Sequence, residues 1–524
     1  MSTELAPIDY AVLVVYLLAT VALGIAIGRR IKTSSDFFLA GRRLPWWAIG
    51  MSLVATDIGG TDIIGVGGAA YSYGMAVANF EWIGCIPAMM VGAFIFIPYF
   101  YRTGVYTIPE FMERRYNAGV RTALGLCWLL FMACNLGIML LASAKMMGAL
   151  FGWDQTTCIL ATAALVGVYT CVGGLAAVVY TDTIQCAVMI AGCLLVLVIG
   201  LRDIGGVGEL RRQLEEREQA ARAAASAEDG DVVEHTSLVL PVDSKSPFPW
   251  TGIFFGLALV LSPAYWLGNQ AIVQRSLGAR SEFEAKASYV WGAVLKNVIP
   301  FIIAVPGLIA LVKFPEMQDG DQAFPALVSA LLPVGLRGLF LAAFVAALMS
   351  SVDSYLNASA TILTNDFYKR FIKKDADDRH LLFVGRVVTL GLVIWAIIFA
   401  LLLTRMEEGI YAIFQTLLSF FQGPALAILL CGILWRRANG TGAFVGFVTG
   451  VLFSISLFTL NQKPVFTALG LDPLFQVQQP FLYFSVWSFL LALGLVIGIS
   501  LLTKPEPEEK VAALIYHRRE RTQP

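Results

Sequence analysis

Apolar stretches long enough to cross a bilayer recur about thirteen times along this 524-residue chain, and this repetition limits the fold more than any other feature of the sequence. A transmembrane helix needs about 20 mostly apolar residues, because the hydrocarbon core of a bilayer is about 30 Å thick. Only 14% of the residues are charged, against about 25% in soluble domains. We therefore predict an all-α polytopic membrane protein. Its predicted spans are 9–28, 46–72, 80–101, 123–151, 157–179, 182–201, 249–273, 287–312, 335–365, 381–404, 409–434, 441–460 and 481–502.

The basic residues are unevenly distributed between the loops, although the formal net charge is zero. Lys and Arg follow the odd-numbered spans, and the loops after even-numbered spans carry almost none outside segment 202–248. Cytoplasmic loops of membrane proteins are enriched in Lys and Arg. We therefore expect a multi-pass protein of the plasma (inner) membrane with its N-terminus outside and its C-terminus in the cytoplasm. The basic residues concerned are Arg29, Arg30, Lys32, Arg42, Arg43, Arg102, Arg114, Arg115, Arg121, Arg275, Arg280, Lys286, Lys369, Arg370, Lys373, Lys374, Arg379, Arg436, Arg437, Arg518, Arg519 and Arg521.

Two of the predicted spans look broken. Gly59 and Gly60 interrupt the span 46–72, and Ser262 and Pro263 interrupt the span 249–273. Gly frees the backbone and Pro removes a hydrogen-bond donor. Five spans separate the breaks, as in transporters built from inverted repeats, where discontinuous helices expose backbone carbonyls to a cation near mid-membrane. The alternative is that Gly and Pro are simply frequent in membrane helices.

The matched breaks predict a five-plus-five inverted-repeat core of the leucine-transporter type. We expect one transmembrane transporter domain over 1–503, with repeats at approximately 46–201 and 249–434. The extended polar insertion, 202–248, is expected to lie outside the membrane as a surface cover. Residues 504–524 would form a short cytoplasmic tail.

The apolar stretch 344–366 is unusually rich in hydroxyl groups. Ala347, Ser350, Ser351 and Ser354 have the spacing i, i+3, i+4 and i+7, so they share one face of a helix. Hydroxyl and carbonyl oxygens suit a small hard cation better than a transition metal. Together with carbonyls freed at the break before Gly59, they could form a cage for Na⁺. The alternative is ordinary Ser and Thr packing between helices.

Ionisable residues inside membrane spans are costly and usually mark a substrate or ion path. Lys296 lies about ten residues from the nearest cytoplasmic end of its span and needs a partner, such as Glu81 or Asp62. Glu81 and Asp182 could instead be interfacial and solvated. Aromatic residues near these charges fit either a membrane-interface belt or a gated cavity. The charged residues are Asp57, Asp62, Glu81, Asp182, Lys296 and Asp353, and the aromatic residues include Phe80, Tyr265 and Phe414.

An enzyme is not expected from this sequence. The eight Cys lie in or beside apolar segments without metal-ligand spacing, and the three His lie in loops or the tail. No pairing of a nucleophile with a base, no glycine-rich phosphate loop and no nucleic-acid signal stands out. We expect no prosthetic group, no nucleic-acid partner and no obligatory protein partner.

Several longer motifs resemble one family. These motifs are FFLAGRRLPWWAIGMSLVATDIGG, GVYTIPEFMERRY, GGLAAVVYTDTIQ, NQAIVQRSLGAR and SSVDSYLNASATILTNDFY. Shorter ones are FEW at 80–82, YW at 265–266, LK at 295–296 and FQ at 414–415. By the longer motifs the chain resembles the sodium/solute symporter family over roughly residues 5–460, and by the shorter ones its sodium–glucose cotransporter branch.

The resemblance implies alternating-access import of a solute on a sodium gradient, with Na⁺ as the co-transported ion and the bilayer as the medium. It places the main sodium site on Ala55, Ile58, Ala347, Ser350 and Ser351, and a second cation site on Asp182, Ser350, Asp353 and Ser354. It places solute contacts on Asp62, Glu81, Ser262, Lys296 and Gln415, to which we add Asp57. Tyr265 would form the inner gate, flanked by Phe80 and Phe414.

Four positions depart from the sugar branch: Asp57, Asp62, Ser262 and Asp353. Two carboxylates at one cation site could bind sodium more tightly, or one of them could hold a proton, so proton coupling stays open. We expect a sodium-coupled symporter of a small polar solute, most simply a sugar or polyol. The alternative is a sodium- or proton-coupled symporter of an amino acid or another amine, whose ammonium would face Asp57 and Asp62. A channel is a further alternative.

Overall fold

The computed structural model describes residues 6–29, 31–225, 233–244, 246–404, 410–461, 477 and 480–515. Within these ranges the chain is helical and has no strand beyond two isolated β-bridges. Ten helices are long and apolar enough to cross a membrane, and two bent pairs bring the number to twelve. This confirms the predicted all-α polytopic fold. The fifth predicted span corresponds to a shorter apolar segment, Gln155–Gly167.

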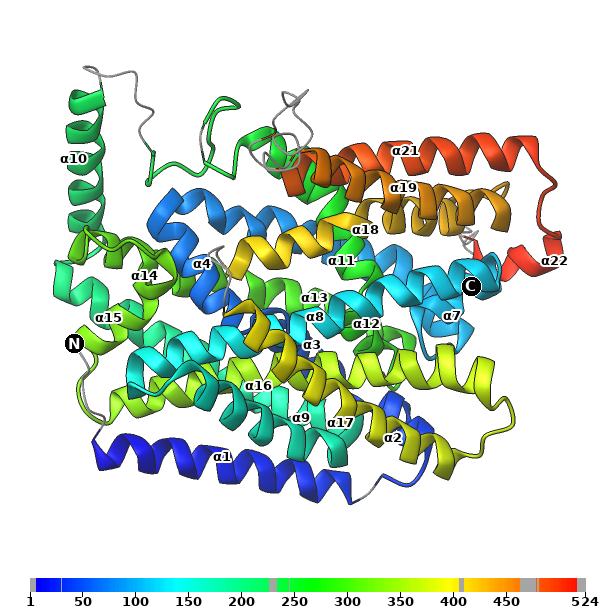
Figure 1. The fold of residues 1–524 in the computed structure, drawn as a ribbon, viewed down its shortest axis with the longest axis horizontal. Helices are drawn as coiled ribbons and strands as arrows, with labels where there is room; N and C mark the ends of the chain where they lie inside the picture. Colours follow the sequence, from blue (N-terminus) through cyan, green and yellow to red (C-terminus); the bar gives the residue numbers. More distant parts are fainter. Residues whose placement is uncertain are drawn as a thin grey trace, which may run out of the picture.

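The main helices run along the long axis of the molecule (Figure 1). The start of α1 (Pro7–Gly28) and helix α10 (Val207–Ala225) lie at one end of this axis, and α22 (Glu508–Val511) lies toward the other. Further helices besides the broken ones are α8 (Ala118–Phe151), α9 (Gln155–Ile204), α13 (Glu282–Lys296), α14 (Ile299–Lys313), α16 (Leu336–Ile362), α17 (Asp378–Leu403), α18 (Ile410–Leu434), α19 (Gly440–Leu460) and α21 (Pro480–Leu502).

Several of these helices begin at a side chain that caps their free N–H groups. Asn117 accepts from Val120 N at the start of α8, and Ser281 accepts from Glu284 N at the start of α13. Such caps stabilise a helix by about 1 kcal/mol. The same pattern recurs at Asp154, Asp377 and Asn439 before α9, α17 and α19.

The first break in a span lies where the sequence predicts it. Helices α3 (Trp46–Asp57) and α4 (Gly60–Tyr73) are bent by 56° at Ile58 and Gly59. A Cβ on Gly59 would lie 2.6 Å from the Ser351 hydroxyl of α16. The glycine therefore permits a close approach of the two segments as well as the bend.

The second break is not at Ser262 and Pro263, as the sequence analysis placed it, but at Asn269. A π-helix, η5 (Gly252–Leu261), runs straight into α11 (Ser262–Gly268), and a bend of 51° separates this unit from α12 (Gln270–Leu277). Pro263 is the second residue of α11, directly after the π-helical turns of η5, and the helix continues through it. Asn269 is extended at φ −71° and ψ 117°, and its side chain caps α12 at Ala271 N over 2.9 Å.

The fifth and sixth predicted spans join in one helix, α9. Its kink is at Gly174, where φ is 55°. A Cβ there would lie 2.8 Å from the Phe37 ring and 2.9 Å from the Phe37 carbonyl oxygen. The close approach of Phe37 at this kink requires a residue without a side chain. Asp182 follows the kink and is fully buried, so it is not solvated at an interface.

Helix α16 is at the centre of the packing. The apolar part of this span is 94% buried within the protein, against 22% for α1 and 28% for α21. It packs against α9, α8, α1 and α3. The hydroxyl-rich stretch predicted from the sequence is thus surrounded by protein and not by lipid.

Candidate functional site

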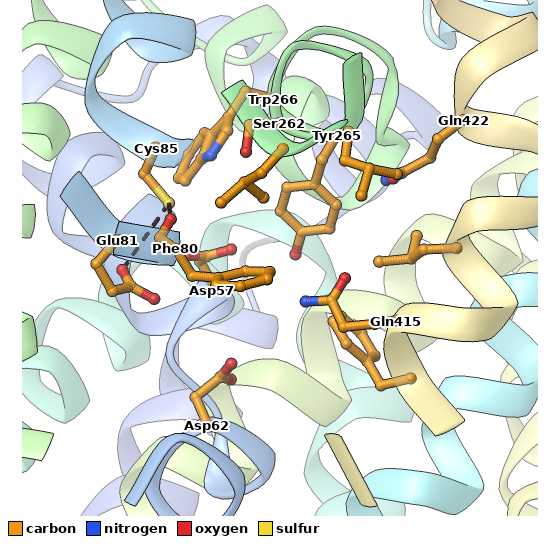
Figure 2. A pocket seen from close by; sticks show the side chains of 14 residues that line it. Asp57, Asp62, Phe80, Glu81, Cys85, Ser262, Tyr265, Trp266, Gln415 and Gln422 are labelled. Atoms are coloured by element: carbon orange, nitrogen blue, oxygen red, sulfur yellow. Dashed lines mark hydrogen bonds between the residues drawn. The ribbon is translucent and has the colours of Figure 1, made fainter. Parts of the chain in front are cut away.

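A cavity with about 490 Å³ of empty space, counted out to open solvent, lies beside the break between α3 and α4. Figure 2 shows the acidic side chains on one side of it, beside Phe80 and Trp266, and Tyr265 with the amides of Gln415 and Gln422 on the other. Its lining residues are Asp57, Asp62, Phe80, Glu81, Cys85, Leu257, Leu261, Ser262, Tyr265, Trp266, Phe414, Gln415, Leu418 and Gln422. Five of the six predicted solute residues and all three predicted gate residues are among them.

Lys296, the sixth predicted solute residue, lies behind the cavity wall and is fully buried. Its ammonium contacts the carboxylates of Asp57 and Glu81 and lies 5.7 Å from the centre of the Trp266 ring. Of the two partners that the sequence suggested, Glu81 is confirmed and Asp62 is wrong. Lys296 is the last residue of α13, which packs along α3 and thereby reaches the break after Asp57.

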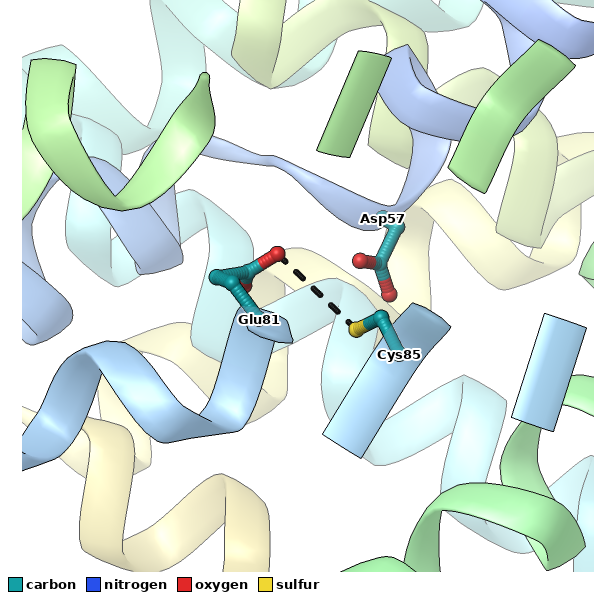
Figure 3. A group of neighbouring side chains, drawn as sticks. All are labelled: Asp57, Glu81 and Cys85. Carbon is teal, nitrogen blue, oxygen red and sulfur yellow. Dashed lines mark hydrogen bonds between the residues drawn. The ribbon is translucent and has the colours of Figure 1, made fainter. Parts of the chain in front are cut away.

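Glu81 is held by an unusual turn. Residues Phe80–Cys85 form a π-helical turn, η3, of a kind often found at functional sites. Cys85 Sγ donates to the Phe80 carbonyl at 3.3 Å and contacts Glu81 Oε2 at 3.8 Å. Asp57, Glu81 and Cys85 offer ligand atoms within 4.8 Å of one another (Figure 3). The Lys296 ammonium already bonds both carboxylates, so the group reads as an ion cluster and not as a metal centre.

Asp62 has a second task besides lining the cavity. Its Oδ2 accepts from Gly59 N at 2.9 Å, which caps the N-terminus of α4. A carboxylate is favourable there because the N-terminus of a helix carries partial positive charge. This position explains how a carboxylate is tolerated beside Asp57 and Glu81.

The predicted main sodium residues converge between α3 and α16. Ser350 Oγ donates to the carbonyl oxygens of Ala55 at 2.7 Å and Ala347 at 2.9 Å. Ser351 Oγ donates to the carbonyls of Thr56 at 3.0 Å and Ala347 at 3.2 Å. Ile58, the fifth predicted residue, forms the non-helical link after α3, with ψ 86°. The structure thus brings hydroxyl and backbone oxygens together where the helix ends, which is the donor set that a hard monovalent cation requires.

The predicted second cation residues surround a side chain that the sequence analysis placed in a cytoplasmic loop. Arg275, on α12, is 1% exposed. Its Nη2 contacts Asp182 Oδ2 at 3.4 Å and the Ser354 hydroxyl, and its Nε donates to Ser52 Oγ at 2.7 Å. Asp353 Oδ1 accepts from Ser354 Oγ at 3.2 Å.

The three predicted gate residues cover different parts of the cavity. Tyr265 and Tyr355 share a hydroxyl hydrogen bond of 3.0 Å, and Asn269 Nδ2 donates to Tyr355 at 3.3 Å. Tyr355 and Asn269 were not singled out from the sequence. Gln415, on α18, points from the opposite side toward the Tyr265 hydroxyl (Figure 2).

Phe80 and Phe414 are held by aromatic neighbours. The Phe80 ring lies 5.5 Å from Phe248 of the polar insertion and 6.5 Å from Phe481 of α21. Phe414 lies 5.7 Å from Phe131 of α8. The insertion 202–248 therefore covers the side of the cavity on which Phe80 lies.

The sequence model of the Sodium:solute symporter family matches residues 37–450. The chain belongs to the sodium:solute symporter family. A sodium/glucose cotransporter of Vibrio parahaemolyticus is 33% identical over 86% of this chain and 85% of its own length. A sodium/myo-inositol cotransporter 2 of Oryctolagus cuniculus is 31% identical over 98% of this chain and 80% of its own length.

Solved structures give the same fold. A Na⁺-coupled sialic acid symporter in a substrate-bound outward-open state superposes with a TM-score of 0.78 at 22% identity, covering 95% of this chain and 99% of its own. A nucleobase-cation-symport-1 family transporter has a TM-score of 0.55 over 92% of this chain and 99% of its own. Membership of the sodium:solute symporter family means that the chain is a multi-pass membrane transporter coupled to sodium, not an enzyme.

Proposed function

We propose that this symporter imports a sugar or polyol together with Na⁺ by alternating access. The observation that carries the proposal is that one helix break serves two sites. Before the break, the carbonyls of Ala55 and Thr56 meet the hydroxyls of α16. At the break, the side chain of Asp57 lines the solute cavity. Unwound segments with free carbonyls are where transporters of this architecture hold their coupling ions.

This arrangement suggests how ion and solute are coupled. The hydroxyls of Ser350 and Ser351 donate to backbone carbonyls of α3. A bound Na⁺ would take the oxygens of Ala55, Ile58, Ala347, Ser350 and Ser351 as ligands and fix α3 against α16. Asp57 moves with the end of α3, so the ion would also set the shape of the solute cavity.

The cavity lining favours a neutral solute with several hydroxyl groups. Carboxylates of Asp57 and Glu81 accept hydrogen bonds, the Gln415 amide can donate and accept, and Ser262 adds a hydroxyl. Tyr265 and Phe80 offer flat apolar faces. Such a site rejects analogues that leave its buried polar groups unpaired. The names of the glucose and myo-inositol relatives support this solute class.

An amine-bearing solute is the second candidate, and one observation favours it. Three carboxylates, Asp57, Asp62 and Glu81, stand against the single ammonium of Lys296. A cationic solute would reduce this excess of negative charge. An amino acid fits less well, because its own carboxylate would compete with Asp62 for the N-terminus of α4.

We propose that the protein lies in the plasma (inner) membrane with its N-terminus outside, as the distribution of Lys and Arg predicts. The division into a domain 1–503 with two inverted repeats and a tail 504–524 remains a proposal, supported by the bends at Gly59 and Asn269. The second cation site also stays a prediction, because the Arg275 guanidinium contacts two of its four residues.

The test is uptake of radiolabelled galactose, glucose and myo-inositol into proteoliposomes with an inward sodium gradient, compared with a choline gradient of equal strength. Accumulation that requires sodium and is abolished by a sodium ionophore is the expected result. Uptake should be blocked by excess unlabelled sugar or polyol. If amines block uptake of a tracer and sugars do not, the second candidate replaces the first.

A further inference from the structure

A second cavity lies at the far end of the helix that carries Ser350 and Ser351, and it shares no lining residue with the solute cavity. Helix α16 continues as a π-helix, η7 (Leu363–Ile372), which faces α7 (Ile108–Arg115) and the start of α8. The cavity is open and has about 1200 Å³ of empty space. It is lined by Tyr106, Glu110, Arg121, Asn365, Lys369, Arg370, Phe371 and Lys374.

The floor of this cavity is a fixed ion-pair network. Asp366 accepts from Thr107 Oγ1 at 2.9 Å and from Arg121 Nε at 2.7 Å. Arg121 also pairs with Glu113 at 2.6 Å, and Arg370 contacts the same carboxylate. These pairs hold η7 against α7 and α8, so the side chains above them stand on a rigid base.

The lining keeps positive charge after these pairs are counted. Glu110 is the one acidic lining residue, and it pairs with Arg114 at 2.7 Å. Arg121 and Arg370 are neutralised by Glu113 and Asp366. Lys369 and Lys374 are exposed and have no ion pair within the part of the chain that the structure describes. Two uncompensated ammonium groups therefore face one open cavity.

The cavity also lies at the level of the lipid head groups. The span Leu336–Ile372 has 37 residues, which is about 55 Å at about 1.5 Å per residue. This exceeds a bilayer of about 40–45 Å including its head groups, so the η7 end reaches the head-group region or beyond. Phe371 is 59% and Ile372 73% exposed beside the two lysines. Apolar and basic side chains side by side match the boundary between acyl chains and phosphates.

We propose that this cavity binds the phosphate head group of an anionic phospholipid in the cytoplasmic leaflet. Lys369 and Lys374 would contact the phosphate, and Phe371 and Ile372 would lie against the upper acyl chain. Basic clusters at this position are attracted to anionic lipids by about 1 kcal/mol for each Lys or Arg. Because η7 is continuous with α16, the lipid would hold the cytoplasmic end of the helix that carries the main sodium residues.

The experiment measures the dissociation constant of lipid from the thermal-unfolding shift of the full chain, purified in a neutral detergent. Short-chain phosphatidylglycerol is the probe, with short-chain phosphatidylcholine and inorganic phosphate as comparison ligands. The double variant K369Q/K374Q should bind phosphatidylglycerol about 25-fold more weakly, since two contributions of about 1 kcal/mol are lost and about 1.4 kcal/mol corresponds to tenfold.

The matched control is K373Q/R379Q, which removes the same charge from exposed residues that do not line the cavity, Lys373 directly after η7 and Arg379 in the first turn of α17. It should bind phosphatidylglycerol as the unaltered protein does. If the double variant does not fold, K374Q alone should weaken binding about fivefold on the same reasoning.

Three outcomes would overturn the proposal. Equal weakening in K373Q/R379Q would mean attraction to the surface as a whole. An equal shift with phosphatidylcholine would mean that the head-group charge is irrelevant. An equal shift with inorganic phosphate would mean a soluble anion and not a lipid. Sodium-dependent uptake plays no part in these measurements, so they stand apart from the test of the transport function.

Discussion

Two buried cations, Lys296 and Arg275, illustrate two uses of charge inside one protein. Each is at most 1% exposed, and each links a broken helix to its neighbours. Lys296 joins α13 to Asp57 at the end of α3. Arg275, on α12, joins Ser52 of α3, Asp182 of α9 and Ser354 of α16.

The two clusters differ in access. Asp57 and Glu81, the partners of Lys296, line the solute cavity, whereas no partner of Arg275 does. A solute hydroxyl can therefore replace part of the bonding around Lys296, while the bonds of Arg275 are exchanged only within the protein. Burying an ion pair costs free energy, and removing one partner costs more. We therefore expect loss of Lys296 to appear mainly in transport and loss of Arg275 mainly in stability.

The largest effect is expected for Arg275→Ala. It leaves Asp182 buried without its cation, so the free energy of unfolding should fall by about 3–5 kcal/mol. The measurement is denaturant-induced unfolding of the purified protein in detergent. Arg102→Ala is the control, because Arg102 forms an exposed pair with Glu282, which is expected to contribute about 0–1 kcal/mol. Equal destabilisation by both variants would contradict the prediction that Arg275 stabilises the packing of α12 against α3, α9 and α16.

Lys296→Ala should lower solute uptake by about 100-fold or more, because it leaves Asp57 and Glu81 without their donor. Thermal stabilisation by sodium should persist, since the oxygen cage is untouched. The control is Lys313→Ala, whose side chain pairs with Asp203 at a partly exposed position. Normal uptake by Lys296→Ala would show that the contacts of Lys296 with Asp57 and Glu81 only stabilise the structure, as is expected for the contacts of Arg275.

Replacing both Ser350 and Ser351 with Ala should raise the sodium concentration for half-maximal uptake about tenfold. Each hydroxyl contributes a hydrogen-bonding group of about 0.5–1.5 kcal/mol. Ser454→Ala is the matched control. Its buried hydroxyl donates to the Ser419 carbonyl at 3.2 Å between α19 and α18, which carry none of the predicted sodium residues. An unchanged sodium dependence would place the ion elsewhere.

The smallest effect is expected for Tyr265→Phe. It removes the hydrogen bond between the hydroxyls of Tyr265 and Tyr355 at the edge of the cavity. The loss of one such bond should raise the half-saturating solute concentration about two- to tenfold. Uptake at saturating solute is the comparison. The control is Tyr483→Phe, which loses a bond to Thr251, and neither of these residues lines the cavity. If the half-saturating solute concentration changes more in Tyr483→Phe than in Tyr265→Phe, Tyr265 is not a gate residue.

The sequence predicts the fold well where a pattern has one physical reading. The long apolar segments correctly predicted most of the membrane-spanning helices, and the pair Gly59 and Gly60 predicted the first break. The second break was misplaced because the helix continues through Pro263 from η5 into α11. The bend lies instead at Asn269, whose side chain caps α12, and Asn has no helix-breaking tendency as strong as that of Pro.

Charge partners were harder to predict than positions. Lys296 was identified from its depth in an apolar span. Its second partner could not be predicted, because it depends on the residue at which α3 ends: the carboxylate of Asp57 contacts Lys296, whereas that of Asp62 caps α4. Arg275 was misread because a cation near the end of a span is normally cytoplasmic. Only the packing of α12 against α3 and α16 shows that it is buried.

The burial of α16 also has a consequence for how the protein meets membranes of different thickness. Helices α1, α19 and α21 present most of their surface outward, so they must tilt or distort when the hydrocarbon layer is thinner or thicker. The middle of α16 touches protein almost everywhere. Hydrophobic mismatch therefore acts on Ser350 and Ser351 only through the helices that pack against the middle of α16. This packing shields the proposed sodium site from changes in lipid chain length.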